Sequence, residues 1–171
     1  MRKAVPVLLI VGFAAFIIYM ISGMKSVQET PPGPISLPEQ FGAFRQTYLA
    51  TGEEGLLNFD RQHKKRIPIK EGVKGEYTDG TVKVDLWVAN GAGPTHAHQM
   101  FMEMASTIGT DHLIFTQPKP VELGSITGYR TEGQEAVNFF FTKDGRVYWI
   151  GIRGGNPDEV VKTFLSGLVD P

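Results

Sequence analysis

The stretch VNFFFTKDGRVYWIGI, residues 137–152, predicts a β-hairpin that turns at Asp144-Gly145. Aromatic and β-branched residues on both sides of an Asp-Gly pair are typical of two strands joined by a two-residue type I′ turn. Counting outward from the turn pairs Phe141 with Tyr148, Phe139 with Ile150 and Val137 with Ile152 on one face, and Thr142 with Val147, Phe140 with Trp149 and Asn138 with Gly151 on the other. Neither face is polar. We therefore expect either a central hairpin covered on both sides, or an exposed aromatic patch at Phe140 and Trp149.

A second hairpin is predicted in VKGEYTDGTVKVDLWVA, residues 73–89, with its turn at Asp79-Gly80. Counting outward pairs Glu76 with Lys83 and Lys74 with Asp85, and opposite charges on directly opposed residues stabilise a sheet. The other face collects the apolar residues Val73, Tyr77, Val82, Val84, Leu86 and Val88. This alternation indicates one buried face and one face in contact with water.

Two amphipathic helices are predicted between and after the hairpins. The segment NPDEVVKTFLSGLV, residues 156–169, has Asn156 as a predicted N-cap and acidic residues in its first turn. Residues 95–108 carry an apolar stripe at helical spacing, which Thr95 is expected to cap and Gly109 to end. That stripe consists of Ala97, Met100, Phe101, Met104, Ala105 and Ile108. Weaker strands are predicted near residues 44–51, 56–62, 112–116 and 126–131.

These elements predict an α+β domain over residues 41–171, in which two helices pack on one antiparallel sheet. The coarse layout resembles the group of sandwich domains that includes the photosystem accessory protein PsbP and the Ran-binding protein Mog1. The resemblance covers the order and spacing of the elements, and no functional residue is carried over from it.

The segment MRKAVPVLLIVGFAAFIIYMISGMKS opens the chain with two cations and continues with 20 uncharged residues, 4–23. A helix of that length rises about 30 Å, the thickness of the hydrocarbon core of a bilayer. A cleavable signal peptide is the main alternative, but its apolar region is shorter, about 7–15 residues, and ends in a small-x-small site that this segment lacks. We therefore expect residues 4–24 to form an uncleaved transmembrane anchor.

The charges that flank this anchor predict its orientation. Arg2 and Lys3 precede it and Lys25 follows it, so the positive-inside tendency keeps a tail of residues 1–3 in the cytoplasm. The domain then lies outside the cytoplasm, attached to the cell membrane by a single span. Residues 25–40 contain four prolines and are expected to form an extended linker between membrane and domain.

GPTHAHQMFMEM, residues 93–104, places two histidines two positions apart. On a helix His96 and His98 lie about 200° apart and cannot share one small ion, whereas metal-binding histidines on a helix are usually spaced i, i+4. On a strand the same pair would chelate. We therefore expect no metal or other cofactor, and we keep His96 and His98 as weak candidates for a metal-dependent hydrolase.

Two surfaces are candidates for contact with a partner or a lipid. RQHKKRIPIK, residues 61–70, holds five cations and no acid, namely Arg61, Lys64, Lys65, Arg66 and Lys70. Such a run suits either a solvated edge or contact with anionic headgroups. The second candidate is the face that carries Phe140 and Trp149.

The composition limits the function further. Residues 25–171 carry 15 basic and 18 acidic residues, which argues against nucleic-acid binding. The chain has no cysteine, and it contains none of the sequence motifs of common hydrolases. We therefore expect a non-enzymatic accessory or binding module attached to the membrane, which binds a membrane protein or an anionic surface. The main alternative is a domain that binds a soluble ligand or a lipid in a pocket between sheet and helix, lined by methionine and aromatic residues.

Overall fold

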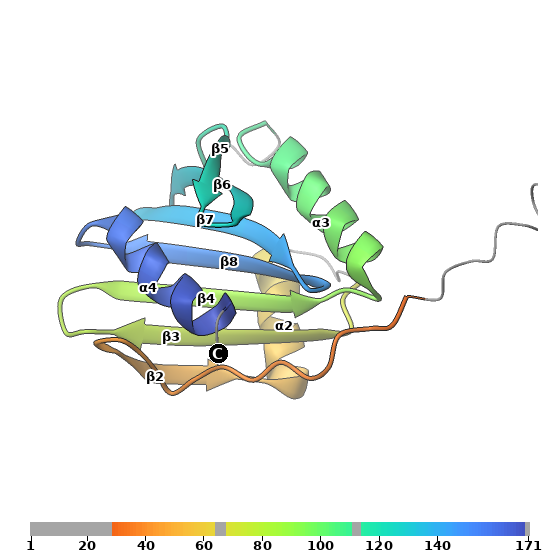
Figure 1. Cartoon of the computed structure of the whole chain (residues 1–171), viewed down its shortest axis with the longest axis horizontal. Coiled ribbons are helices and arrows are strands. Elements are labelled where there is room, and N and C mark those ends of the chain that lie inside the picture. The colour runs from red at the N-terminus through yellow and green to blue at the C-terminus, as the bar shows by residue number, and fades with distance from the viewer. Residues whose placement is uncertain (1–28, 64–67, 111–113, 170–171) are drawn as a thin grey trace, which may run out of the picture.

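The computed structural model describes residues 29–63, 68–110 and 114–169, which fold into one antiparallel sheet with helices on both of its faces (Figure 1). The elements are β1 Gln40–Phe41, β2 Phe44–Ala50, α2 Gly52–His63, β3 Glu71–Thr78, β4 Lys83–Asn90, α3 Pro94–Thr107, β5 Lys119–Leu123, β6 Ile126–Gly133, β7 Ala136–Lys143, β8 Arg146–Arg153 and α4 Pro157–Val169. The eight strands follow the order β1-β2-β3-β4-β8-β7-β6-β5. The predicted α+β class with an antiparallel sheet is therefore confirmed.

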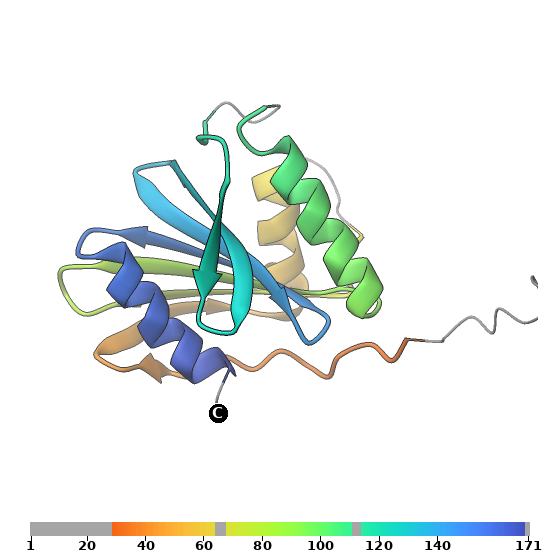
Figure 2. The same cartoon turned by 45° about the horizontal axis from the view of Figure 1, so that its top comes forward.

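Helix α4 covers one face of the sheet, and helices α2 and α3 cover the other (Figures 1 and 2). The α4 face holds the main core, in which Phe164 stacks on Phe41 with ring centroids 4.5 Å apart and meets Tyr77 edge-on. On the opposite face Phe59 of α2 lies edge-on to Trp87, and Phe101 of α3 packs on the buried ring of Phe140. Both faces of the central strands are thus covered, at least in part, by helices.

Helix α2 corrects the prediction of a strand at residues 56–62, so the described part of the domain has three helices where two were predicted. Its buried residues, Gly55 and Phe59, are four positions apart, which is the period of a helix. Glu53 and Glu54 in its first turn favour the helix through its dipole. A Cβ at Gly55 would lie 1.9 Å from the carbonyl oxygen of Gly72, so only glycine permits this helix to lie so close to β3.

The structure confirms the predicted register of the hairpin at residues 137–152. Phe141 pairs with Tyr148, Phe139 with Ile150 and Phe140 with Trp149, and the turn residues Asp144 and Gly145 both have positive φ. A type I′ turn requires positive φ at both central positions.

The register of the hairpin at residues 73–89 differs from the prediction by two residues, because Thr78 pairs with Lys83 and Glu76 with Asp85. The Asp79 carboxylate accepts hydrogen bonds from the N–H groups of Thr81 and Val82 and so stabilises a longer loop than the predicted turn. A shift of two leaves every side chain on its predicted face. The like charges of Glu76 and Asp85 are each offset, by Lys74 at 2.5 Å and by Arg153 at 2.6 Å respectively.

The predicted tail at residues 1–3 and the predicted anchor at 4–24 lie outside the described residues. Among the residues that the structure does describe, no helix combines the length and the apolar character needed to cross a bilayer.

Candidate functional site

Residues 29–40, which we call the strap, run in extended form along the sheet and lead into β1 (Figure 1). Ile35 of the strap is buried in the core of the α4 face, and Leu37 packs against the same core. The backbone carbonyl of Pro38 accepts a hydrogen bond from the Tyr77 hydroxyl at 3.0 Å. The described part of the predicted linker is therefore held against the domain at several positions, although most of its residues stay exposed.

Three polar side chains at one end of the sheet hold the strap by its backbone. Glu71, Asn90 and Arg146 stand at the ends of β3, β4 and β8 and are paired in register, Glu71 with Asn90 and Asn90 with Arg146. We call these three residues the clasp, and the end of the sheet that bears them the strap end. The other end, at Thr78, Lys83 and Arg153, is the far end.

Each clasp residue bonds to the strap. The Glu71 carboxylate accepts the N–H of Ile35, with both oxygens 3.1 Å from the nitrogen. The Asn90 amide donates to the carbonyl of Gly33 at 3.0 Å, and the Arg146 guanidinium donates to the carbonyls of Gly33 at 2.9 Å and Pro34 at 3.1 Å. All of these bonds reach main-chain atoms, so the clasp fixes the path of the strap.

The clasp residues also bond to one another. Asn90 is 4% exposed, donates to the Glu71 carboxylate at 2.8 Å and accepts from Nε of Arg146 at 3.1 Å. Hydrogen bonds with one charged partner are stronger than neutral ones, and leaving a buried amide without its hydrogen-bond partners costs free energy of folding. The neighbouring Tyr148 has a pKa raised by burial, and Arg146 opposes that rise through a hydrogen bond and its charge.

The first described residue of the strap, Glu29, meets the beginning of α3. Its carboxylate accepts hydrogen bonds from the N–H of Thr95 at 2.9 Å and from the Thr95 hydroxyl. The predicted capping role of Thr95 is not observed, since the N-cap is Gly93 and no side chain of the helix itself caps it. Glu29 supplies the negative charge that the positive end of a helix dipole favours. The strap end therefore combines the clasp with this second attachment.

His96 and His98 lie on α3, as predicted. Nδ1 of the half-buried His96 accepts a hydrogen bond from the N–H of Ala92 at 3.0 Å, and the exposed His98 ring lies 6.1 Å from that of Phe101. The described part of the chain contains no cluster of three or more His, Cys, Asp or Glu residues that is suited to a metal ion. A metal site at these histidines has no third ligand among the described residues.

Phe140 and Trp149 lie in a hairpin that is covered on this face, and they do not form the exposed aromatic patch that was the other expectation. Phe140 is 0% exposed and stacks on Trp149, with ring centroids 5.4 Å apart. Phe101 of α3 and Ile108, the residue that follows the helix, close over Phe140, and Phe115 lies edge-on to the half-buried Trp149. In this structure Phe140 therefore presents no surface to a partner.

The basic stretch at residues 61–70 is described only at its ends. Arg61, in the last turn of α2, is exposed, and so is Lys70, which stands next to the clasp residue Glu71. The N–H of Lys70 donates to the carbonyl of Asn90, which places Lys70 at the strap end. Lys64, Lys65 and Arg66 lie outside the described residues.

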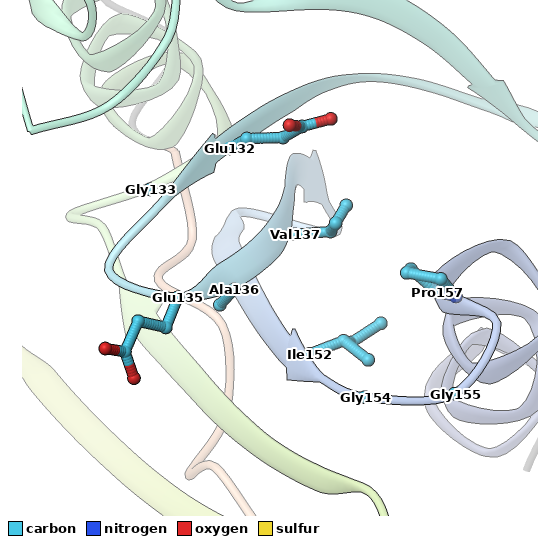
Figure 3. Close-up of a pocket in the computed structure, with 9 residues that line it drawn as sticks. All are labelled: Glu132, Gly133, Glu135, Ala136, Val137, Ile152, Gly154, Gly155 and Pro157. Carbon is cyan, nitrogen blue, oxygen red and sulfur yellow. The ribbon is translucent and has the colours of Figure 1, made fainter.

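A cavity of ≈ 420 Å³ lies at the far end of the sheet (Figure 3). Its lining consists of Glu132, Gly133, Glu135, Ala136, Val137, Ile152, Gly154, Gly155 and Pro157. Figure 3 shows Val137, Ile152 and Pro157 turned toward a common space, while the Glu135 side chain points away from it. The lining contains no methionine and no aromatic residue, so it differs from the pocket expected between sheet and helix.

The strap and its clasp were not predicted. The prolines of residues 25–40 are typical of an extended linker. Glu71, Asn90 and Arg146 are separated from the strap residues that they hold by 36 to 113 positions. The one signal in the sequence was Ile35 with Leu37, two apolar residues within the predicted linker.

Comparison with known proteins gave no match to a family model, a curated protein or a solved structure. The resemblance to the PsbP and Mog1 group stays a prediction.

Proposed function

We propose that this chain is a single-pass membrane protein whose residues 4–24 anchor a non-enzymatic accessory module outside the cytoplasm, with the N-terminus in the cytoplasm. The observation that carries the proposal is the run of 20 uncharged residues, 4–23, preceded by Arg2 and Lys3. A segment that is apolar on all sides suits lipid better than the edge of a small domain.

The domain itself supports a binding role over a catalytic one. Among the described residues, no buried side-chain nitrogen or oxygen lacks a hydrogen-bond partner. Active sites are places where strongly perturbed titratable groups gather in a cleft. The described groups with shifted pKa values are instead separate: Tyr77 and Tyr148 are raised by burial, Asp79 is lowered by its hydrogen bonds, and Lys162 is raised by Glu159.

The basic stretch is the proposed contact of the module with anionic headgroups or an acidic membrane protein. Cations near an anionic surface contribute about 1 kcal/mol each. Replacing Arg61 and Lys70 with glutamate is expected to weaken binding of the domain to vesicles that contain phosphatidylglycerol. The matched control is Lys119→Glu on the edge strand β5, far along the sheet from Lys70, which should leave that binding unchanged.

Fractionation of cells that make the full chain with a C-terminal tag tests the anchor. We expect the protein to stay in the membrane after alkaline extraction, and an added protease to remove the tag only where the outer face of the membrane is accessible. Leu9→Arg with Ile17→Arg, about 3 kcal/mol each against insertion, should release the protein. A mature product that begins beyond Gly23 and is recovered in the soluble fraction would contradict the proposal.

A second candidate function is the binding of a small ligand at the far-end cavity, whose volume lies within the range of ligand sites. Thermal-shift measurement with lipids and small metabolites tests it, with Val137→Trp as a variant that fills the cavity. A ligand that stabilises the parent chain but not this variant supports the second candidate.

A further inference from the structure

We propose that the clasp, together with the contact of Glu29 with Thr95, turns the strap into a short, directional tether, so that the strap end of the domain faces the membrane and the far end faces away. The inference rests on the proposed anchor and adds the orientation and the distance of the domain. The surface that the strap end faces is the headgroup layer of the bilayer.

The length of chain between the anchor and the first attachment of the strap, Glu29 at Thr95, sets the distance. Residues 25–40 as a free linker are 16 residues long and would span up to about 55 Å, enough for the domain to turn in any direction. With Glu29 attached to Thr95, only residues 25–28 remain, and four residues span at most about 14 Å. The headgroup layer alone occupies about 6 Å of that length. The beginning of α3 is therefore held within about 10 Å of the headgroup surface.

The strap resists being pulled away from the domain because it is attached at several separate points. Glu29 is held by Thr95, the strap backbone by Arg146 and Asn90, and Ile35 by the core. A force along the chain from the membrane acts first on Glu29 and then on the clasp, and both lie at the same end of the sheet. The N–H of Gly91, just before α3, donates to the carbonyl of Gly145, which joins the two loops of this end.

The exposed residues at the strap end are compatible with a headgroup surface. Lys70, Ala92, Pro94 and Asp144 are all exposed there, and none of them is a large apolar side chain that would have to enter the hydrocarbon. The far end, from Asn90 to Lys83 along β4, lies seven residues further, or about 24 Å. The far-end cavity then faces the aqueous phase, away from the membrane.

Headgroup quenching of a fluorophore tests this orientation, and the chain has no native cysteine that would interfere with labelling. Ala92→Cys at the strap end and Lys83→Cys at the far end are both exposed positions. Each full-length variant is labelled with the same fluorophore and placed in phosphatidylcholine vesicles that contain a headgroup spin-labelled phosphatidylcholine. We expect quenching at position 92 to be several-fold stronger than at position 83.

A third protein, with a longer tether, distinguishes the tether from other causes of unequal quenching. A flexible Gly/Ser segment as long as the strap, inserted between Gln28 and Glu29, leaves the clasp intact but lengthens the tether. In this protein, the quenching at position 92 should fall to the level at position 83. Equal quenching at both positions of the parent chain, or an insertion without effect, overturns the inference while the anchor stands. Failure of the labelled parent chain to float with the vesicles overturns the anchor, and the inference with it.

Discussion

The two ends of the sheet are held together by different kinds of contact. At the strap end, three side chains from three strands hold a segment that lies 36 to 113 positions away in the sequence. At the far end, side chains hold their own turns: Asp79 accepts from Thr81 and Val82, and Asn156 accepts from Asp158. The turns of the far end can form locally, whereas the clasp exists only when sheet and strap are both in place. The strap end therefore depends more strongly on the global fold.

Removal of the central clasp side chain is expected to lower stability more than any other change at the two ends of the sheet. Asn90→Ala should lower the free energy of unfolding by about 3 kcal/mol, because Glu71 and Arg146 each lose a buried partner. Asn156→Ala at the far end loses a local N-cap and should cost about 1 kcal/mol. Urea unfolding of the whole chain measures both. Equal losses at the two ends would remove the distinction between them.

The apolar anchor of the strap is expected to have the next largest effect. Ile35→Ala leaves a void in the core and should cost about 2 kcal/mol, whereas truncation of Leu49, which is 41% exposed, should cost much less. Ile35→Ala should also speed cleavage after Glu39 by a protease specific for glutamate. If that cleavage is unchanged in Ile35→Ala, the core does not hold the strap.

The hydrogen bond between Tyr77 and the strap is expected to contribute less. Tyr77→Phe removes the donor to Pro38 and the partner of the Gln46 amide, at a cost of about 1 kcal/mol. Burial raises the pKa of Tyr77, so its neutral form is the one the fold favours, and stability should fall as the pH rises through the pKa of tyrosine in the unfolded chain. Denaturant titrations at neutral and alkaline pH should show a smaller decline for Tyr77→Phe than for the parent chain.

The smallest effect is expected at the loop of the far end. The hydrogen bonds from Val82 and Thr81 hold the pKa of Asp79 below its usual value. The stability that its carboxylate contributes is therefore present above the pKa of the unfolded chain and is lost as the pH falls through the lowered value. Asp79→Asn should slightly reduce the loss of unfolding free energy at acidic pH and leave the cleavage after Glu39 unchanged. Urea unfolding and proteolysis of the variant and the parent chain over a series of pH values would check both.

The two hairpins explain how much of the fold could be predicted. Asp144 and Gly145 adopt the type I′ turn that their residue types favour, and the predicted register of β7 and β8 was correct. The equally plausible Asp79-Gly80 pair gave a register wrong by two residues, because the Asp79 side chain organises a longer loop. Periodicity assigned the side chains to the correct faces in both cases, but it did not show that α2 packs on the face of the 73–89 hairpin predicted to contact water, and turn geometry determined the register.

Elements that depend on distant partners were the ones the sequence could not show. Helix α2 carries few apolar residues, and the close approach of Gly55 to β3 is visible only in the fold. The edge strand β5 contains Pro120 and has little alternation, so it was not predicted. The clasp was missed for the same reason, since its hydrogen bonds are made to main-chain atoms of the strap and leave no motif.

Amide hydrogen exchange at Ile35 in the full-length chain tests most directly whether the strap belongs to the fold. The N–H of Ile35 is bonded to the Glu71 carboxylate and the residue is 8% exposed. We expect this amide to be protected to a degree comparable with the central strand β4, and we expect Glu71→Ala to remove the protection. Exchange in the parent chain as fast as at the exposed Thr30 would contradict this expectation.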